Sequence, residues 1–492
     1  AVSSGFKGSC AIQGTGPTST SGTLFCWGSG PIVGDGSNNS SNVPVAVSAT
    51  AGFANTAVTA VAVGEGHACA IEAGMLWCWG SAYLANQWGV LGAGVASSLT
   101  PILVSANGDF DNDGAAGDAV TAVAAAYAVT CAIEGGQTFC WGNNNSDNLG
   151  VGPNASSPIN EPTRVRDSAT PEFQAATATE LSVGFFHVCA TASTSVYCWG
   201  FNNEGRLGDG STTFSNAPLK AAQGGFATAN ANVSGLDLGW YHSCALQGGI
   251  VRCWGEGTYN QLGTGNTSHV SSPTDVGSGN GFTNAGNVSA VSAGERHTCA
   301  IESGTVYCWG LNGSGRLGDG TTTDAASPVA VSTSDVPGFN NTAVTAVSAG
   351  SQHTCAIENK VVYCWGSNTD NQLGDGASMT QLKPVRVFVT SAPAAPTISV
   401  RTGASGELNV DVTKPNDGGS TITSYEYTID NEATWAAVAF SNTNFQTITI
   451  SGLTDGTQYS VKVRAVNAIG NGAASAAATG TPTAMQNNPN PN

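Results

Sequence analysis

The sequence predicts an all-β protein, in which a seven-bladed β-propeller is followed by a small β-sandwich. The tripeptide Cys-Trp-Gly occurs seven times, and each copy has a second cysteine upstream. Each repeat also carries four short runs with alternating apolar residues, bounded by Gly, Asn, Asp and Ser, which predict strands. Repeats of this length with four strands each are typical of propeller blades. A change of pattern near residue 391 indicates the second domain.

The seventh repeat shows the four predicted strands in order. The first run is 344–350, the second is 353–357, and the third enters Cys-Trp-Gly at 361–366. A Leu-Gly-x-Gly turn follows, and the last run begins at Pro384, where proline suits an edge strand because it cannot donate to the ladder. The turn recurs in every repeat, at Gly34, Gly92, Gly150, Gly208, Gly263, Gly318 and Gly374.

The cysteine spacing favours a disulfide within each repeat, because cysteines nine residues apart can face each other across a hairpin. Zinc is the alternative, since His67, Cys69 and Cys78 could share one face of a strand. Two repeats replace the histidine by Gly8 and Val129 but keep both cysteines, which favours disulfides. The predicted pairs are Cys10–Cys26, Cys69–Cys78, Cys131–Cys140, Cys189–Cys198, Cys244–Cys253, Cys299–Cys308 and Cys355–Cys364.

The two ends of the repeat region predict how the ring closes. The chain begins inside the first strand of repeat one, as a processed product would, and repeat seven ends with the run 384–387. On this reading repeat one lacks a strand and repeat seven has one in excess. We therefore expect the last strand to pair into the N-terminal blade and remove both open edges.

The repeat region, residues 1–390, resembles the regulator of chromosome condensation repeat family. The resemblance rests on the Gly-x-x-His-x-Cys-Ala-Ile, Val-Tyr-Cys-Trp-Gly and Arg-Leu-Gly-Asp-Gly stretches, which are clearest at 294–320. It implies the propeller fold, whereas family members differ in function. The paired cysteines are similar to the secreted bacterial branch and depart from the nuclear members.

The chain after residue 390 has a different organisation. A Pro/Ala linker, 391–396, precedes a domain at 397–483 with alternating runs and no cysteine, which predicts a β-sandwich. This domain resembles fibronectin type III, because Leu453 precedes Tyr459 as in a tyrosine corner and 461–470 is similar to the following strand and turn. The Asn/Pro-rich tail, 484–492, has a composition that favours disorder.

Composition excludes several function classes. Charged residues make up only 10% of the chain and the net charge is −18, with no basic run, which argues against nucleic acid as a partner. No apolar stretch is long enough for a membrane span. Seven disulfides require an oxidising compartment, so we expect an extracellular or cell-surface protein.

An acidic segment, 109–114, suggests a calcium site. Alternating aspartates with glycine at the sixth place can surround a hard cation with oxygen ligands. The usual twelfth-position glutamate is replaced by Val120, and a nearby aspartate could take its place. We read the segment as an insertion within a blade connection, and a solvated acidic loop is the alternative. The predicted ligands are Asp109, Asp111, Asp113 and Asp118.

Histidine and glutamate recur at fixed positions of the repeat. Histidine occupies the same place in five repeats, and we expect each to anchor its own blade turn, with a ring of histidines around the channel as the alternative. No acid–base partner recurs beside them, so the sequence predicts no catalytic site. The residues are His67, His187, His242, His297 and His353, and the recurring glutamates are Glu72, Glu134, Glu302 and Glu358.

The dipeptide before the histidine position varies while its surroundings repeat. Four of the seven copies carry aromatic residues, which often anchor interfaces when they lie on exposed turns. Equivalent turns should share one face of the propeller, where these side chains either bind a partner or plug the channel mouth. The candidate binding residues are Phe6, Tyr127, Phe185, Phe186, Trp240, Tyr241, Glu295 and Arg296.

These observations favour a non-enzymatic surface protein for adhesion, recognition or assembly into a surface structure or filament. Its partner would be a protein or carbohydrate at the cell surface, or further copies of the chain. A secreted inhibitor that caps an enzyme with its propeller face is the second reading. A hydrolase with an unrecognised site is the third.

Overall fold

The computed structural model describes residues 1–14, 21–81, 89–115, 117–152, 155, 157–166, 171–222, 226, 233–387, 393–415, 422–439, 445–467 and 470–484. The chain divides into two compact units, Ala1–Val387 and Phe388–Asn492. The predicted linker lies partly outside the described residues, and the predicted tail lies outside them from residue 485 onward. Among the described residues, no helix is long and apolar enough to cross a bilayer.

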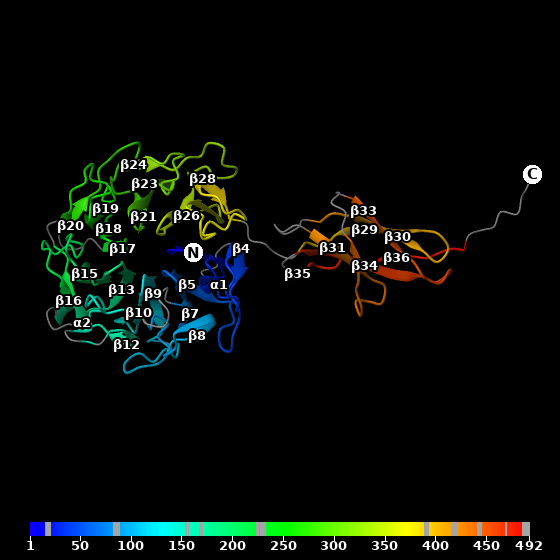
Figure 1. Ribbon diagram of the computed structural model, residues 1–492, viewed down its shortest axis with the longest axis horizontal. Coiled ribbons are helices and arrows are strands. Elements are labelled where there is room, and N and C mark those ends of the chain that lie inside the picture. Colours follow the sequence, from blue (N-terminus) through cyan, green and yellow to red (C-terminus); the bar gives the residue numbers. More distant parts are fainter. Residues whose placement is uncertain are drawn as a thin grey trace, which may run out of the picture. The chain divides into compact units, whose positions relative to one another are not determined.

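The first unit is the predicted propeller, in which seven four-stranded antiparallel blades surround one axis (Figure 1). Each blade uses four consecutive strands, and the first and second blades are also linked by one strand pair, Gly22 with Val58. Two short helices, α1 (Gly30–Val33) and α2 (Pro171–Ala175), lie in connections. The strands of blades one to four are β1 (Val2–Ser4), β2 (Gly8–Gly14), β3 (Gly22–Gly28) and β4 (Ser41–Ala46); β5 (Val58–Val63), β6 (His67–Glu72), β7 (Met75–Ser81) and β8 (Ser97–Leu103); β9 (Val120–Ala126), β10 (Val129–Glu134), β11 (Gln137–Gly142) and β12 (Ile159–Arg164); β13 (Ala178–Val183), β14 (His187–Ala192), β15 (Ser195–Gly200) and β16 (Ser215–Lys220). Those of blades five to seven are β17 (Val233–Leu238), β18 (His242–Gln247), β19 (Ile250–Gly255) and β20 (Val270–Asp275); β21 (Val288–Ala293), β22 (His297–Glu302), β23 (Thr305–Gly310) and β24 (Ala325–Ala330); β25 (Val344–Ala349), β26 (His353–Glu358), β27 (Val361–Gly366) and β28 (Gln381–Arg386).

The cysteines pair within blades, as the spacing predicts. In the second blade, Cys69 of β6 lies directly opposite Cys78 of β7, with 4.1 Å between the Cα atoms. All seven predicted pairs are joined as disulfides, and none of the 14 cysteines is free. The histidine of the same strand bonds a neighbouring blade instead of joining the cysteines, so the structure offers no zinc site of the predicted kind.

The hydrophobic core lies between blades rather than within them. Seven buried clusters surround the axis, and each combines the disulfide of one blade with the tryptophan of the next. Trp27 of the first blade, for example, belongs to the same cluster as Cys355 and Cys364 of the seventh. Each blade contributes residues to two of these clusters, one with each neighbour. A single blade therefore cannot bury its apolar surface alone.

The predicted exchange of a strand at the ring closure is wrong. The segment Val2–Ser4 already forms β1, the inner strand of blade one, and β28 pairs with β27 in its own sheet. The ring closes instead through the same side-chain contacts that join other blades, such as Trp27 Nε1 donating to the Gln372 carbonyl at 2.8 Å. An exchanged strand is unnecessary because inner strands β1 and β25 lie next to each other as other inner strands do.

The second unit contains the predicted β-sandwich. One sheet consists of β29 (Thr397–Thr402), β30 (Leu408–Thr413) and β33 (Phe445–Ile450). The other consists of β31 (Ile422–Thr428), β32 (Ala436–Ala439), β34 (Tyr459–Asn467), β35 (Gly470–Asn471) and β36 (Ala478–Gly480). The tyrosine corner predicted from Leu453 and Tyr459 is present, because the Tyr459 hydroxyl accepts a hydrogen bond of 3.0 Å from the backbone N–H of Thr454.

Candidate functional site: the aromatic face of the propeller

The five recurring histidines connect neighbouring blades. In the fifth blade, the imidazole Nε2 of His242 lies 2.8 Å from the hydroxyl of Thr298 in the sixth blade. That hydroxyl donates to the backbone carbonyl of Gln261, which also accepts the indole N–H of Trp309. The same relay links four further junctions, as His67–Thr130, His187–Ser243, His297–Thr354 and His353–Ser9. The imidazoles therefore bond the next blade. The prediction that each histidine anchors its own blade turn is wrong.

The relay fixes the protonation of these histidines. Because the hydroxyl donates its proton to the carbonyl, the imidazole must donate through Nε2, and a neutral ring then carries no proton on Nδ1. Among the described residues, Nδ1 of all five rings is buried and has no partner. Burial lowers the pKa of His67 to about 4 and that of His353, where Arg316 adds a smaller effect, to about 3. Rings that are buried, neutral and bonded to the next blade through Nε2 have a structural role in the relay.

Two glycines show why the relay needs its particular neighbours. A Cβ on Gly64 would lie 2.5 Å from the imidazole of His67, so this position has room for the ring only without a side chain. Gly374 of the Leu-Gly-x-Gly turn has a φ of +65°, and a Cβ there would lie 2.7 Å from the indole nitrogen of Trp27 in the next blade. Gly64 therefore makes room for the imidazole of its own blade, and Gly374 allows the tryptophan of the next blade to approach closely.

Two junctions lack the relay, and the residues on both sides change together. Val129 replaces the histidine of blade three, and the residue that faces it in blade four is Val188. At the junction of blades one and two, Gly8 stands in place of the histidine and Ala68 in place of the residue with the hydroxyl. At the junction of blades three and four, Trp199 Nε1 also has no hydrogen-bond partner among the described residues, so this contact is apolar.

The turns before the relay carry the predicted aromatic residues, and their rings gather over one end of the central channel. Phe185 of blade four lies 4.3 Å from Tyr127 of blade three and 4.7 Å from Trp240 of blade five, between ring centroids. Trp240 in turn stacks on Phe6 of blade one at 5.6 Å, with an interplanar angle of 7°. We call this set, with Phe186 and Tyr241, the aromatic cluster. All six residues keep part of their surface exposed.

A cavity of about 240 Å³ runs along the inner strands of all seven blades, and Phe6, Tyr127 and Trp240 of the aromatic cluster line it. Because the Phe6–Trp240 stack joins blades one and five, it crosses the mouth of this cavity. The cluster is therefore both a cover of the channel and a partly exposed apolar surface. The two readings of the sequence, plug and binding face, describe the same six side chains.

The two charged candidates lie beside the cluster. Glu295 lines the same cavity and accepts a hydrogen bond of 2.5 Å from the Ser351 hydroxyl. The guanidinium of Arg296 lies 4.3 Å from the ring centroid of Tyr259, and its Nε is 3.6 Å from the Glu295 carboxylate. A pairing of this kind holds the charged side chains in place at the rim.

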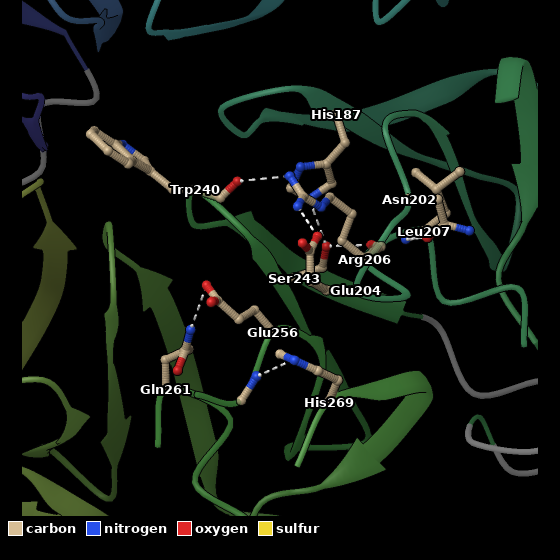
Figure 2. A network of polar contacts seen from close by, with 11 residues as sticks. His187, Asn202, Glu204, Arg206, Leu207, Trp240, Ser243, Glu256, Gln261 and His269 are labelled. Carbon is tan, nitrogen blue, oxygen red and sulfur yellow. Dashed lines mark hydrogen bonds and ion pairs between the residues drawn. The ribbon is translucent and has the colours of Figure 1, made fainter. Parts of the chain in front are cut away.

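Blades four and five continue this rim with a polar network that the sequence analysis missed (Figure 2). Arg206 is completely buried, pairs with Glu204, and donates a long hydrogen bond of 3.5 Å to the Trp240 carbonyl. Its guanidinium also lies 4.8 Å from the ring centroid of Tyr241 and 5.0 Å from that of Phe201. Arg206 thus supports the aromatic cluster from beneath. The Arg-Leu-Gly motif was visible in the sequence, but its contact with the next blade was not.

The acidic segment lies at the opposite end of the blades, since Asp118 precedes β9 and Tyr127 follows it. Its Phe110 is buried, and Asn112 donates to the carbonyls of Leu76 and Val104. Phe53 with Asn55, Phe282 with Asn284, and Phe339 with Asn341 occupy the same place in other blades. Only the residues after Asn112 are therefore inserted, whereas the sequence suggested that the whole segment is.

The recurring glutamates hold these connections. The carboxylate of Glu134 accepts the backbone N–H groups of Asp111 and Asn112, at 3.0 and 2.8 Å. Glu72 accepts four such bonds, including those of Ala54 and Ala57. Their role is structural, which agrees with the sequence-based interpretation.

Three of the four predicted calcium ligands come together. Asp111, Asp113 and Asp118 each offer a carboxylate oxygen within 4.8 Å of the others. Asp109 is turned toward the neighbouring strand, where its carboxylate lies 3.1 Å from the guanidinium of Arg164. Three aspartates could therefore bind a cation together, whereas Asp109 forms an ion pair with Arg164.

Comparison with known proteins identifies both domains. Residues 23–407 match the RCC1-like domain, and residues 391–481 match the fibronectin type III domain. The ultraviolet-B receptor UVR8 of Arabidopsis thaliana is 30% identical over 393 residues, which cover 76% of this chain and 80% of the receptor. The E3 ubiquitin-protein ligase HERC2 of Homo sapiens is 29% identical over 293 residues, which cover 58% of this chain but 6% of the ligase.

Solved structures show the same fold. Prp20p from Saccharomyces cerevisiae, described for its binding to Gsp1p and histones, aligns with a TM-score of 0.59 and 21% identity over 74% of this chain and 85% of its own. Human WBSCR16 aligns with a TM-score of 0.58 and 21% identity over 73% and 86%. At this identity the likeness concerns the fold alone.

Proposed function

The chain belongs to the family of RCC1-like propeller proteins, and from this premise we propose that it is an extracellular recognition protein that binds a protein partner through the aromatic cluster. An RCC1-like propeller followed by a fibronectin type III domain is an architecture for protein interaction. The two domains alone do not specify a partner. The proposal that the partner is a protein therefore depends on the chemistry of the face that carries the aromatic cluster.

The observation that carries this proposal is the aromatic cluster itself. Its six side chains are partly exposed, contact one another and stand on turns of four different blades. They are Phe6, Tyr127, Phe185, Phe186, Trp240 and Tyr241. Interfaces concentrate their binding energy in such rings, surrounded by a polar rim. Here the rings are already packed together, so a partner would lose little entropy in ordering them.

The disulfides support an extracellular location. Each closes a hairpin inside a blade, and pairs of this kind persist only in an oxidising compartment. The acidic balance of −18 supports a partner other than nucleic acid. The five buried histidines bond the neighbouring blades, so their recurrence in the sequence has a structural cause.

A peptide-display selection on the full chain tests the proposal with a partner of any sequence. Random peptides are selected against the folded protein, and their affinities for variants are measured. Trp240→Ala and Phe186→Ala should each weaken binding by roughly 1–3 kcal/mol without unfolding the blades. Phe214→Ala is the matched control, since this ring is 57% exposed and lies outside the aromatic cluster.

Two results would refute the proposal. Peptides that bind the two variants as tightly as the parent would place recognition elsewhere, with the fibronectin type III domain as the first alternative. Variants that lose stability but, while folded, bind as tightly as the parent would make the cluster a plug. A carbohydrate array and sedimentation of the free protein cover the remaining partner classes, sugars and self-assembly.

A further inference from the structure

Glu65 stands out among the residues at the channel mouth. It is the second-blade counterpart of Phe6, Tyr127, Phe185 and Trp240, and it lines the same cavity. In blade order it lies between Phe6 and Tyr127, so it is the one of the three non-aromatic residues at this position that has an aromatic residue on both sides.

The carboxylate of Glu65 has no hydrogen bond or ion pair in the part of the chain that the structure describes. Its counterpart in blade six differs, since Glu295 receives the Ser351 hydroxyl and the Arg296 guanidinium. Burial raises the pKa of Glu65, and the positive charge of Lys7 opposes this shift. Glu65 is thus a half-buried carboxylate whose local structure leaves it without a bonded donor.

Cations already lie over aromatic rings on this face of the propeller. The ammonium of Lys7 is 5.7 Å from the centroid of Phe6, and the guanidinium of Arg296 is 4.3 Å from that of Tyr259. A carboxylate next to aromatic faces is a favourable environment for a further cation, because ring and carboxylate both attract positive charge. The net charge of −18 also draws basic partners toward the molecule.

From this arrangement we infer that the protein partner presents a Lys or Arg side chain, which enters the channel mouth beside Phe6 and Tyr127 and pairs with Glu65. This inference rests on the proposed function, since it specifies the partner of the same surface. The aromatic cluster supplies most of the contact, and Glu65 selects for a basic residue within it.

A double-mutant cycle tests the pairing with the selected peptides. Each basic residue of a selected peptide is replaced in turn by norleucine, which keeps the aliphatic stem and removes the charge. One such replacement should weaken binding to the parent about ten-fold, the scale of a partly desolvated ion pair, and should weaken binding to Glu65→Gln clearly less, because only the contact with the rings remains there. Glu65→Gln should melt like the parent, because the carboxylate bonds nothing within the described protein.

Glu295→Gln is the matched control, because its carboxylate is occupied by Ser351 and Arg296. The norleucine replacement should cost the same about ten-fold in this variant. An equal cost in the parent and in Glu65→Gln, or selected peptides without basic residues, would overturn the inference. If the peptides still lost affinity for Trp240→Ala, either of these results would overturn the pairing with Glu65 but leave the proposed function intact. If Trp240→Ala had no effect on binding, the proposed function itself would be wrong.

Discussion

Two junctions of the same ring are built in opposite ways. Between blades five and six, His242 bonds Thr298, which donates to a carbonyl that Trp309 shares. Between blades three and four, Val129 and Val188 take the places of histidine and threonine. The comparison shows that the two residues that meet at a junction match each other: both form the relay, or both are apolar. Where one partner is lost, the other is replaced by a residue that needs no hydrogen bond.

The apolar junction has its own support at the aromatic face. Tyr127 of blade three, two residues before the position where the histidine is absent, packs on Phe185 and Phe186 of blade four. The glycine that makes room for the imidazole in other blades is Ala126 here. Ring packing thus accompanies the loss of the relay, and the surface proposed for binding also joins these two blades.

The largest expected effect is acid instability of the relay junctions. The folded pKa of these histidines lies below the unfolded value of about 6.5, so the unfolded state binds protons first as the pH falls. Stability should be complete above about pH 6.5 and should fall toward pH 4 by roughly 1.4 kcal/mol per pH unit for each histidine. Raised carboxyl pKa values, as at Glu134, act in the opposite direction and reduce the net slope. Urea unfolding of the disulfide-intact protein at pH 7.5, 6 and 5 measures this, and equal free energies at all three values would contradict it.

A single relay can be converted into the apolar kind. His242→Val leaves the Thr298 hydroxyl without its donor and should cost about 2–3 kcal/mol. Adding Thr298→Val reproduces the residues of the junction between blades three and four and should recover part of that loss. Thermal unfolding of the three proteins decides the point. A double variant less stable than the sum of both single changes would show that the relay cannot be exchanged as a set.

The aromatic support of the apolar junction predicts a smaller effect. Tyr127→Ala removes a half-buried ring from the contact with blade four and should cost about 2 kcal/mol. Phe6→Ala makes a comparable truncation in the same cluster, but its ring stacks on Trp240 of blade five and does not pack across the junction of blades three and four, so it should cost less. Chemical denaturation compares the two variants, and the reverse order would separate the cluster from the stability of the apolar junction.

The smallest effect is expected from calcium at the opposite end of blade three. We propose that Asp111, Asp113 and Asp118 hold one Ca²⁺, with Asp109 retained by Arg164. Calcium at ten times its dissociation constant should then stabilise the fold by about 1.4 kcal/mol. Calorimetry with calcium and with chelator measures the shift, and Asp111→Ala should abolish it while Asp109→Ala retains most of it. Parent and Asp111→Ala proteins that respond alike would leave the cluster as a solvated loop.

The sequence was informative wherever a signal recurred. Seven Cys-Trp-Gly copies predicted the blades, and the spacing of Cys69 and Cys78 predicted their hairpin and bond. The relay was missed because its two halves lie in different repeats. A signal did exist: reading the residue after the histidine position one repeat ahead gives Thr or Ser wherever histidine is present and Ala68 or Val188 where it is absent.

Features without repetition were harder to foresee. The pairing of Asp109 with Arg164 depends on how two segments 55 residues apart meet, and nothing local encodes it. The shared Phe-x-Asn turn was obscured at 109–114 because aspartates fill its variable positions. The closure of the ring was predicted wrongly because a three-residue inner strand at Val2–Ser4 was not counted as the complete first strand of its blade.

Hydrogen–deuterium exchange of the full chain, with and without a saturating selected peptide, locates the binding surface. We expect protection to be confined to the aromatic face, in the turns around Phe6, Tyr127, Phe185 and Trp240 and in the neighbouring connection at Phe201–Leu207. Protection confined to the opposite loops near Asp111, or to strands of the fibronectin type III domain, would contradict it.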